Sequence, residues 1–223
     1  MSLGTWGRKT KSMTVRETVA VLVAHPDDET LWAGGTLISE PRWSPFVWCA
    51  CRANDADRAP KFLRVLKRLR AQGAMADLDD SPDQPPLADE RVEQAMLECL
   101  PQRRFDRILT HSPLGEYTRH RRHEDVGRAV LRLWLRGTLS AAELWLFAYD
   151  DDGGRRLPRP IASADIVVEL SLDVWEQKHR LITQDYGFAE QSWEARVTPR
   201  SEGFFRVMTA ERATAWLEER RGQ

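Results

Sequence analysis

Two clusters of polar residues carry side chains that could bind a metal ion or transfer a proton. The first, "AHPDDE" at positions 24–29, directly follows a short and almost wholly apolar run. The second, "THSPLGEYTRHRRHED" at positions 110–125, also begins where an apolar run ends. The groups with this chemistry are His25, Asp27, Asp28, His120 and His123.

Two histidine nitrogens and one carboxylate oxygen form a three-ligand set for zinc, with the fourth position left for water. That open position distinguishes a catalytic zinc site from a structural one. A metal-bound water with a pKa of about 7 is a usable nucleophile at neutral pH. One carboxylate could then bind the metal while its neighbour takes the proton of the water.

Each cluster alone has a simpler explanation. Asp27 or Asp28 could cap the helix that we expect to follow. The segment "RHRRHED" could be a solvated basic turn or a patch that contacts phosphate. A lone histidine after a strand is more often structural than catalytic. The two clusters together are harder to explain in this way, because H-x-x-D after one strand and H-x-x-H after another form a specific pairing.

Strand and helix patterns alternate along the chain. The predicted strands are Thr18–Ala24, Phe46–Arg52, a short one within 74–86, Phe105–His111, Glu143–Tyr149 and Ala164–Leu170. The predicted helices are Glu29–Ile38, Ala59–Gln72, Leu87–Leu100, Glu124–Leu135, Leu172–Thr183 and about Ala210–Arg220. This alternation predicts an α/β protein, with a three-layer Rossmann-like fold and a mostly parallel sheet. Ligands of such sheets bind beyond the carboxyl ends of the strands, so the two clusters converge if their strands are neighbours.

The composition is that of a globular protein with one sizeable domain. The 223 residues contain 33 Lys and Arg against 34 Asp and Glu, and this net charge of -1 argues against a nucleic-acid or membrane partner. No apolar stretch approaches the roughly 18 residues that a membrane span needs. Residues 1–14 are basic but lack the apolar segment of a signal peptide, so we expect a flexible leader and a single domain over 15–223.

The three cysteines cannot form a disulfide framework, which indicates a reducing, cytoplasmic setting. Cys49 and Cys51 alternate on a predicted strand, so we expect both to be buried on one face as small apolar side chains.

The two clusters resemble the motifs of the PIG-L/LmbE-type metal-dependent deacetylases. "AHPDDE" after an apolar strand and the later "GEYTRHRRHEDVG" segment carry this resemblance, which covers the chain from Val19 to about Thr183. Members of the family remove acyl groups, typically acetyl, from amino sugars and related conjugates. The resemblance therefore implies a zinc-dependent N-deacetylase, with another divalent metal as an alternative, acting on a small acylated amino sugar or glycoconjugate. The oligomeric state, including a homo-oligomer, stays open.

The resemblance also implies a role for each residue of the two clusters. His25, Asp28 and His123 correspond to the zinc ligands of the family. Asp27 corresponds to its general base. His120 corresponds to the histidine that stabilises the tetrahedral oxyanion.

Three further residues are candidates for contact with the substrate. Tyr117 lies near a position where some family members have a tyrosine that assists the oxyanion. Trp32 follows the first motif, and its ring could form a wall against which a sugar stacks. Arg122 replaces the aspartate of the family pattern H-x-D-H. We expect it to contact an anionic substrate group or the oxyanion, to pair with Asp or Glu at the rim of the site, or to face solvent.

Two other functions remain open at this level. A metal-dependent phosphoesterase could use the same ligands while Arg119, Arg121 and Arg122 hold the phosphate. A non-catalytic binding module could retain the fold for a partner.

Overall fold

Strands and helices alternate along the described residues, 16–83, 85–117 and 120–219 of a computed structural model. The strands are β1 (Glu17–Val23), β2 (Trp43–Cys51), β3 (Gln72–Leu78), β4 (Arg107–Thr110), β5 (Glu143–Phe147), β6 (Tyr149–Asp150), β7 (Arg159–Pro160), β8 (Ile166–Glu169) and β9 (Ser201–Val207). The helices are α1 (Asp28–Ser39), α2 (Arg58–Arg68), α3 (Asp89–Cys99), α4 (Arg121–Leu135), α5 (Leu172–Arg180), the π-helical turn η1 (Leu181–Asp185), α6 (Trp193–Val197) and α7 (Ala210–Glu218).

The predicted leader, residues 1–14, lies outside the described residues. The assignment of 15–223 to a single domain stays a prediction. Within the described ranges, no helix has the length and apolar character needed to cross a membrane.

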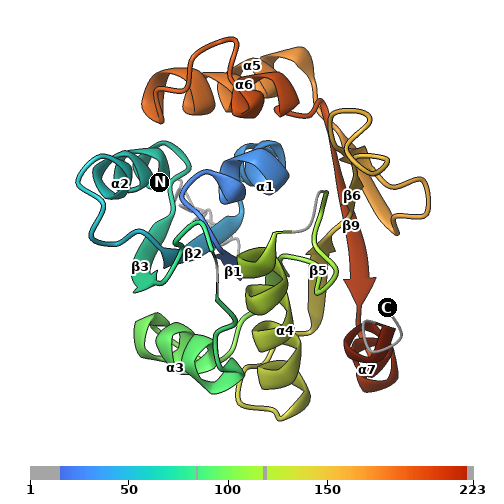
Figure 1. Cartoon of the computed structure of the whole chain (residues 1–223). Helices are drawn as coiled ribbons and strands as arrows, with labels where there is room; N and C mark the ends of the chain where they lie inside the picture. Colours follow the sequence, from blue (N-terminus) through green and yellow to red (C-terminus); the bar gives the residue numbers. More distant parts are fainter. Residues whose placement is uncertain (1–15, 84, 118–119, 220–223) are drawn as a thin grey trace, which may run out of the picture.

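A seven-stranded sheet forms the centre of the described structure, in the order β3, β2, β1, β4, β5, β9, β8 (Figure 1). The first five strands of the chain run parallel, whereas β9 pairs antiparallel with β5 and β8 antiparallel with β9. The mostly parallel α/β sheet that the sequence predicts is therefore confirmed. The strand order reverses at β1, because β2 and β3 lie on one side of it and β4 on the other. Ligands of open parallel sheets bind at such a reversal.

Helices cover both faces of the sheet, which gives three layers (Figure 1). Val19, Val21 and Val23 of β1 belong to one buried cluster, together with residues of α1 and α2. Ala20 and Leu22 belong to a second cluster with residues of α3 and α4. All five side chains are 0% exposed. Burial on both faces explains why residues 19–23 of β1 are continuously apolar instead of alternating between apolar and polar residues.

Two features near the carboxyl end of the chain differ from the sequence-based expectation. Strand β9 lacks an apolar or alternating pattern, because "SEGFFRV" includes Glu202 and Gly203 at buried positions. A Cβ atom at Gly203 would lie 2.8 Å from the carbonyl oxygen of Ala148, so the strand requires glycine there. The helix predicted over Leu172–Thr183 ends as α5 at Arg180 and continues as a π-helical turn.

The buried cysteines also differ from expectation, because they lie on opposite faces of the sheet. Cys49 packs in the cluster of α1 and α2, and Cys51 packs in the cluster of α3 and α4. The pairing of β2 with β3 shifts register between these two residues, and such a bulge interrupts the alternation of side chains. Consequently the Cys51 sulfur lies within 4.8 Å of ligand atoms of His25 and Asp80.

A buried ionic network attaches β9 and α5 to α1. Glu202 accepts a hydrogen bond from Lys178 Nζ at 2.6 Å, and both side chains are 0% exposed. The same carboxylate accepts the backbone N–H groups of Gly35 and Thr36, each at 2.7 Å. Gly35 permits this close packing, since a Cβ atom there would lie 2.3 Å from Leu170 Cδ1. Buried charges are tolerated when they are paired and hydrogen-bonded in this way.

Glu202→Ala should lower the free energy of unfolding by about 3–5 kcal/mol, because it leaves the Lys178 ammonium buried without its charge partner. Urea denaturation followed by tryptophan fluorescence measures this loss. Glu169→Ala, at an exposed position of the neighbouring strand β8, is the control and should change stability by less than about 0.5 kcal/mol. Equal stability of the two variants would contradict a stabilising contribution of the network.

Candidate active site

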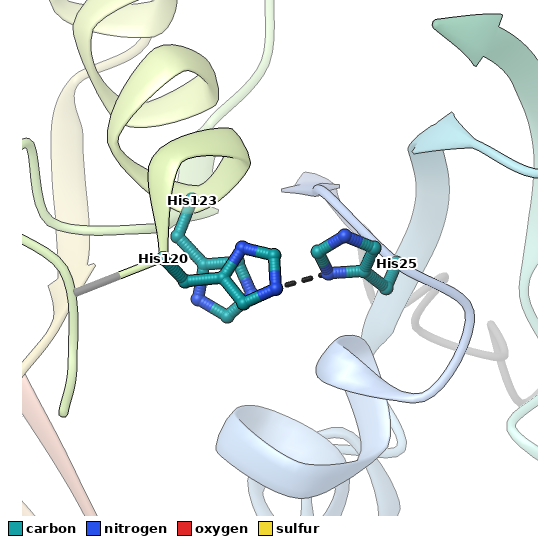
Figure 2. A group of neighbouring side chains, drawn as sticks. All are labelled: His25, His120 and His123. Carbon is teal, nitrogen blue, oxygen red and sulfur yellow. Dashed lines mark hydrogen bonds between the residues drawn. The ribbon is translucent and has the colours of Figure 1, made fainter. Parts of the chain in front are cut away.

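The turn after β1 and the start of α4 meet at the carboxyl edge of the sheet. Leu22 of β1 is paired with Thr110 of β4, so the segments that follow the two strands leave the sheet side by side. His25 lies in the turn after β1, and His120 and His123 lie at the start of α4. Figure 2 shows the imidazole rings of these three residues gathered between the two elements. The two polar clusters therefore meet, because the strands that precede them are neighbours in the sheet.

Three atoms at this junction that could bind a metal ion form a nearly equilateral triangle. His25 Nδ1 lies 3.2 Å from His123 Nε2 and 3.3 Å from Asp28 Oδ2. Asp28 Oδ2 lies 3.4 Å from His123 Nε2. Two ligands of a tetrahedral zinc at bond lengths of about 2.0–2.1 Å are about 3.3–3.4 Å apart. The donor set and its spacing therefore fit a zinc ion.

The charges around the triangle favour a cation. Burial would lower the pKa of His25, but its hydrogen bonds with Asp28 and Asp80 raise that pKa to about 10. Burial would raise the pKa of Asp28, but His123 and His111 hold it well below its usual range. The carboxylates thus stabilise positive charge at this position, which protons or a divalent ion can supply.

A second histidine–carboxylate pair, which the sequence analysis does not identify, lies behind the triangle. His111 is 0% exposed, and its Nε2 accepts the backbone N–H of Ala24 at 3.0 Å. Glu116 lies 3.0 Å from His111 Nδ1 through one oxygen, and 2.6 Å from His123 Nδ1 through the other. His111 Nε2 also lies 3.4 Å from Asp28 Oδ2. Because this nitrogen already accepts the N–H of Ala24, we assign His111 a supporting position beside the triangle.

Asp27 lies beside the triangle in an unusual backbone conformation. Its φ of 135° is in a region that residues other than glycine rarely adopt, and such strain is frequent at functional sites. The Glu29 carboxylate, which is fully buried, accepts the Asp27 backbone N–H at 3.1 Å and helps to hold this turn. The Asp27 side chain makes no capping hydrogen bond to α1 and lies 3.5 Å from Arg58 Nη1. Burial and the charge of Asp28 raise the pKa of Asp27 well above its usual value.

His120 lies next to the triangle, and together with His25 and His123 it places ring nitrogens within 4.8 Å of one another. Its ring stacks on His123 at a centroid distance of 4.5 Å, with 21° between the ring planes. Burial and the nearby His123 and His25 lower the pKa of His120 to about 3. The imidazole is therefore neutral at physiological pH.

A cavity of about 600 Å³ opens beside these groups. Its lining includes Asp27, Asp28, Tyr117, His120 and Trp193. The rings of Tyr117 and Trp193 pack at a centroid distance of 5.0 Å. Both residues also line a neighbouring hollow of about 640 Å³, so they form a wall between the two spaces.

The prediction that Trp32 forms a substrate wall is wrong. Trp32 is 0% exposed and does not line the cavity. Its Nε1 donates a hydrogen bond to Asp28 Oδ1 at 3.1 Å, so the side chain supports this carboxylate from inside the protein. The partly exposed Trp193 lies where Trp32 was expected. Its distance from both motifs in the sequence explains why pattern reading did not identify it.

The prediction that Arg122 faces solvent is wrong, and the alternative that it pairs with an acidic side chain is the one observed, although at a buried position. The residue is 1% exposed and lies outside the lining of the cavity. Its Nε donates to the carbonyl oxygen of Asp79 at 2.5 Å, and its Nη2 donates to that of Pro85 at 2.9 Å. Nη1 donates to Asp125 at 2.7 Å. The guanidinium therefore holds the loop after β3, and Arg119, its neighbour in the proposed phosphate patch, lies outside the described residues.

The chain shares its fold with solved deacetylase structures of the PIG-L/LmbE type, which confirms the resemblance at the level of the fold. The N,N'-diacetylchitobiose deacetylase from Pyrococcus horikoshii is 16% identical, with a TM-score of 0.65 over 90% of this chain and 85% of that one. The A40926 pseudoaglycone deacetylase Dbv21 is 12% identical, with a TM-score of 0.59 over 86% of this chain and 98% of that one. Uncharacterized protein L374 of Acanthamoeba polyphaga mimivirus is 19% identical over 82% of this chain and 81% of its own length. No family model matches the sequence.

The same fold also occurs in a protein with another activity. GalB, the 4-carboxy-2-hydroxymuconate hydratase from Pseudomonas putida, is 14% identical, with a TM-score of 0.59 over 86% of this chain and 97% of that one. The fold alone therefore does not decide between hydrolysis and hydration, and any assignment of function depends on the residues of the site.

The two tryptophans should respond differently to the same substitution. Trp32→Phe should lower the free energy of unfolding by about 1–3 kcal/mol, because it removes the buried donor to Asp28. Trp193→Phe should change stability by less than about 0.5 kcal/mol, since this residue is 37% exposed at the cavity wall. Denaturation curves of both variants measure the difference, and a larger loss at Trp193 would reverse the two assignments.

Proposed function

We propose that the chain is a zinc-dependent hydrolase that removes an acyl group, acetyl in the first instance, from the amine of an amino-sugar-like compound or conjugate. Another divalent metal is compatible with the same ligands. The observation that carries this proposal is the triangle of His25, Asp28 and His123 at the edge of a cavity, with a separate carboxylate, Asp27, beside it. The fold shared with several deacetylases supports the choice of reaction.

His25, Asp28 and His123 would hold the metal through Nδ1, Oδ2 and Nε2. A zinc ion held there supplies polarisation of the acyl carbonyl and activation of a water molecule at neutral pH. The three ligand side chains are nearly excluded from solvent, which strengthens their electrostatic interactions.

Asp27 is the proposed general base. Its carboxylate lines the cavity and is free of the helix-capping contact that would otherwise occupy it. It takes a proton from the attacking water as the oxygen–carbon bond forms. When the carbon–nitrogen bond breaks, Asp27, which holds the proton taken from the water, gives it to the departing amine. The raised pKa of Asp27 brings it closer to the pH at which a base works well in both directions.

His120 and Tyr117 are proposed to contact the reacting acyl group and the substrate. A neutral His120 can donate one hydrogen bond to the oxygen that becomes negative in the tetrahedral intermediate. Tyr117 lines the same cavity and packs against Trp193, so their rings offer an apolar surface to a sugar. Small acylated amino sugars are therefore the first substrates to screen.

His123→Ala and His120→Ala should separate the metal ligand from its stacked neighbour. Removal of His123 takes away one of three ligands, so most of the bound zinc should be lost. Removal of His120 should leave the zinc content close to one per chain while acyl hydrolysis falls. Elemental analysis of the two purified variants decides the matter, and full zinc occupancy in His123→Ala excludes that residue as a ligand.

Asp27→Asn should reduce turnover by about 10²-fold or more, because the amide cannot accept the proton of the water. Its zinc content should stay close to that of the wild type. Mass spectrometry of acylated amino-sugar conjugates, combined with elemental analysis, measures both quantities. Loss of the metal from this variant would make Asp27 a ligand and contradict the proposed division between the two carboxylates.

The products formed by the wild-type chain distinguish the rival functions. Release of acetate supports the deacetylase, whereas release of phosphate from phosphorylated sugars would identify a phosphoesterase. Addition of water without any released group would identify a hydratase. A binding module would show none of these reactions and would keep its ligand affinity in Asp27→Asn.

A further inference from the structure

The two histidines of the triangle differ from His120 in the surroundings of their second ring nitrogen. His123 Nδ1 lies 2.6 Å from Glu116 Oε2, and His25 Nε2 lies 3.1 Å from Asp80 Oδ1. Nδ1 of His120 is buried and has no hydrogen-bond partner among the described residues. Metal-binding histidines usually direct their second nitrogen at a carboxylate or carbonyl, which fixes the ring and raises its basicity. Each proposed ligand histidine thus has a carboxylate of its own.

Asp80 is held in place from its other side. Arg52 donates from Nη2 to Asp80 Oδ2 at 2.7 Å and from Nε to the same oxygen at 3.0 Å. This leaves Oδ1 directed at His25. The Asp80 side chain is only 10% exposed, so solvent competes weakly for these contacts.

The described residues of the loop that carries Asp80 form no helix or strand, and Arg122 holds this loop at two points. Two carbonyl oxygens of the loop, those of Asp79 and Pro85, accept hydrogen bonds from the Arg122 guanidinium. Arg122 directly precedes His123 on α4. One turn of helix therefore provides a ligand of the triangle and also holds the loop whose carboxylate orients another ligand.

We propose that Asp80 is a positioning residue of the metal site, which directs His25 Nδ1 toward Asp28 and His123, and that Arg122 sets the position of Asp80 by holding its loop. The proposal rests on the proposed function, because it takes the triangle as the metal site. The proposal also assigns a structural role to Arg122, the residue that departs from the H-x-D-H pattern.

A second metal site is the competing explanation for the same residues. His25, Cys51 and Asp80 place possible ligand atoms within 4.8 Å of one another. The Arg52 guanidinium, however, binds the Asp80 carboxylate and would repel a cation there. Burial also raises the pKa of the Cys51 thiol, which opposes the thiolate form that metals bind. We therefore expect one zinc ion per chain.

Zinc titrations of the full chain in competition with a chromophoric chelator test the role of Asp80. Asp80→Ala should weaken zinc binding by about 10–100-fold, the usual cost of losing such a partner of a ligand. Asp79→Asn is the matched control in the same loop, because this exposed carboxylate contacts only Ser81 among the bonds described. Its affinity should equal that of the wild type. The unfolding temperature of each metal-free variant separates loss of affinity from loss of folding.

A double-mutant cycle tests the part played by Arg122. Arg122→Lys retains a positive charge near Asp125 but replaces with a single nitrogen the three guanidinium nitrogens that bond Asp79, Pro85 and Asp125. It should weaken zinc binding in the wild-type background and have no further effect in Asp80→Ala, since the two residues act through one contact.

Three results would overturn the inference. The first is an unchanged zinc affinity in Asp80→Ala. The second is a wild-type chain that binds two zinc ions, one of which is lost in Asp80→Ala and in no other variant. The third is an effect of Arg122→Lys on zinc affinity that is equally large in the wild-type and Asp80→Ala backgrounds. Failure of the proposed function looks different. If the chain binds one zinc ion and Asp80→Ala weakens it, yet no acyl amino sugar is hydrolysed, the inference stands and the deacetylase assignment falls.

Discussion

The parallel pairing of β1 with β4 is the constraint on which the candidate site depends. Because β4 pairs with the edge of β1 opposite to β2, the segments that follow β1 and β4 emerge next to each other. This brings together two motifs that are almost 100 positions apart, as the contact between His25 and His123 shows. The continuous burial of β1 stabilises the arrangement, and the strained turn at Asp27 follows directly from its end.

Buried charge is the second organising feature, and at the candidate site carboxylates are paired with histidines. Asp28, Glu116 and His123 are each less than 4% exposed and interact with one another through the histidine rings. Removal of any one partner would leave an uncompensated charge in a medium of low polarity. The same requirement produces the Glu202–Lys178 pair on the other side of α1. At the candidate site, however, the pairs also orient nitrogen and oxygen atoms toward a cavity, so pairing and function coincide.

Relatives with the same fold differ in their reactions, and the structure indicates where such differences can arise. The sheet and its flanking helices provide only the junction of two loops. The deacetylases and the hydratase among the similar structures share this framework at 12–16% sequence identity. In this chain the junction combines three possible metal ligands, the separate carboxylate of Asp27 and the aromatic rings of Tyr117 and Trp193. The proposed function therefore depends on these groups, and the shared fold only adds support to the choice of reaction.

The amino-acid sequence by itself determined the α/β class, most of the strands and helices, and the two motifs that meet at the candidate site. These follow from local signals, because apolar periodicity and the spacing within a motif depend on residues a few positions apart. Tertiary structure alone decided the residues that surround the site. Asp80 lies 55 positions from His25, and Arg122 lies 43 positions from the loop carbonyl of Asp79.

Tertiary structure also decided three other features. Trp32 is buried, Trp193 is partly exposed, and Cys51 packs on the face of the sheet opposite to Cys49. Nothing in the local pattern distinguishes an acidic loop in solvent from one whose carboxylate faces a histidine, or an arginine on a helix surface from one beneath a loop. The partner of a long polar side chain is set by which distant segment packs against it, and packing is a property of the folded chain as a whole.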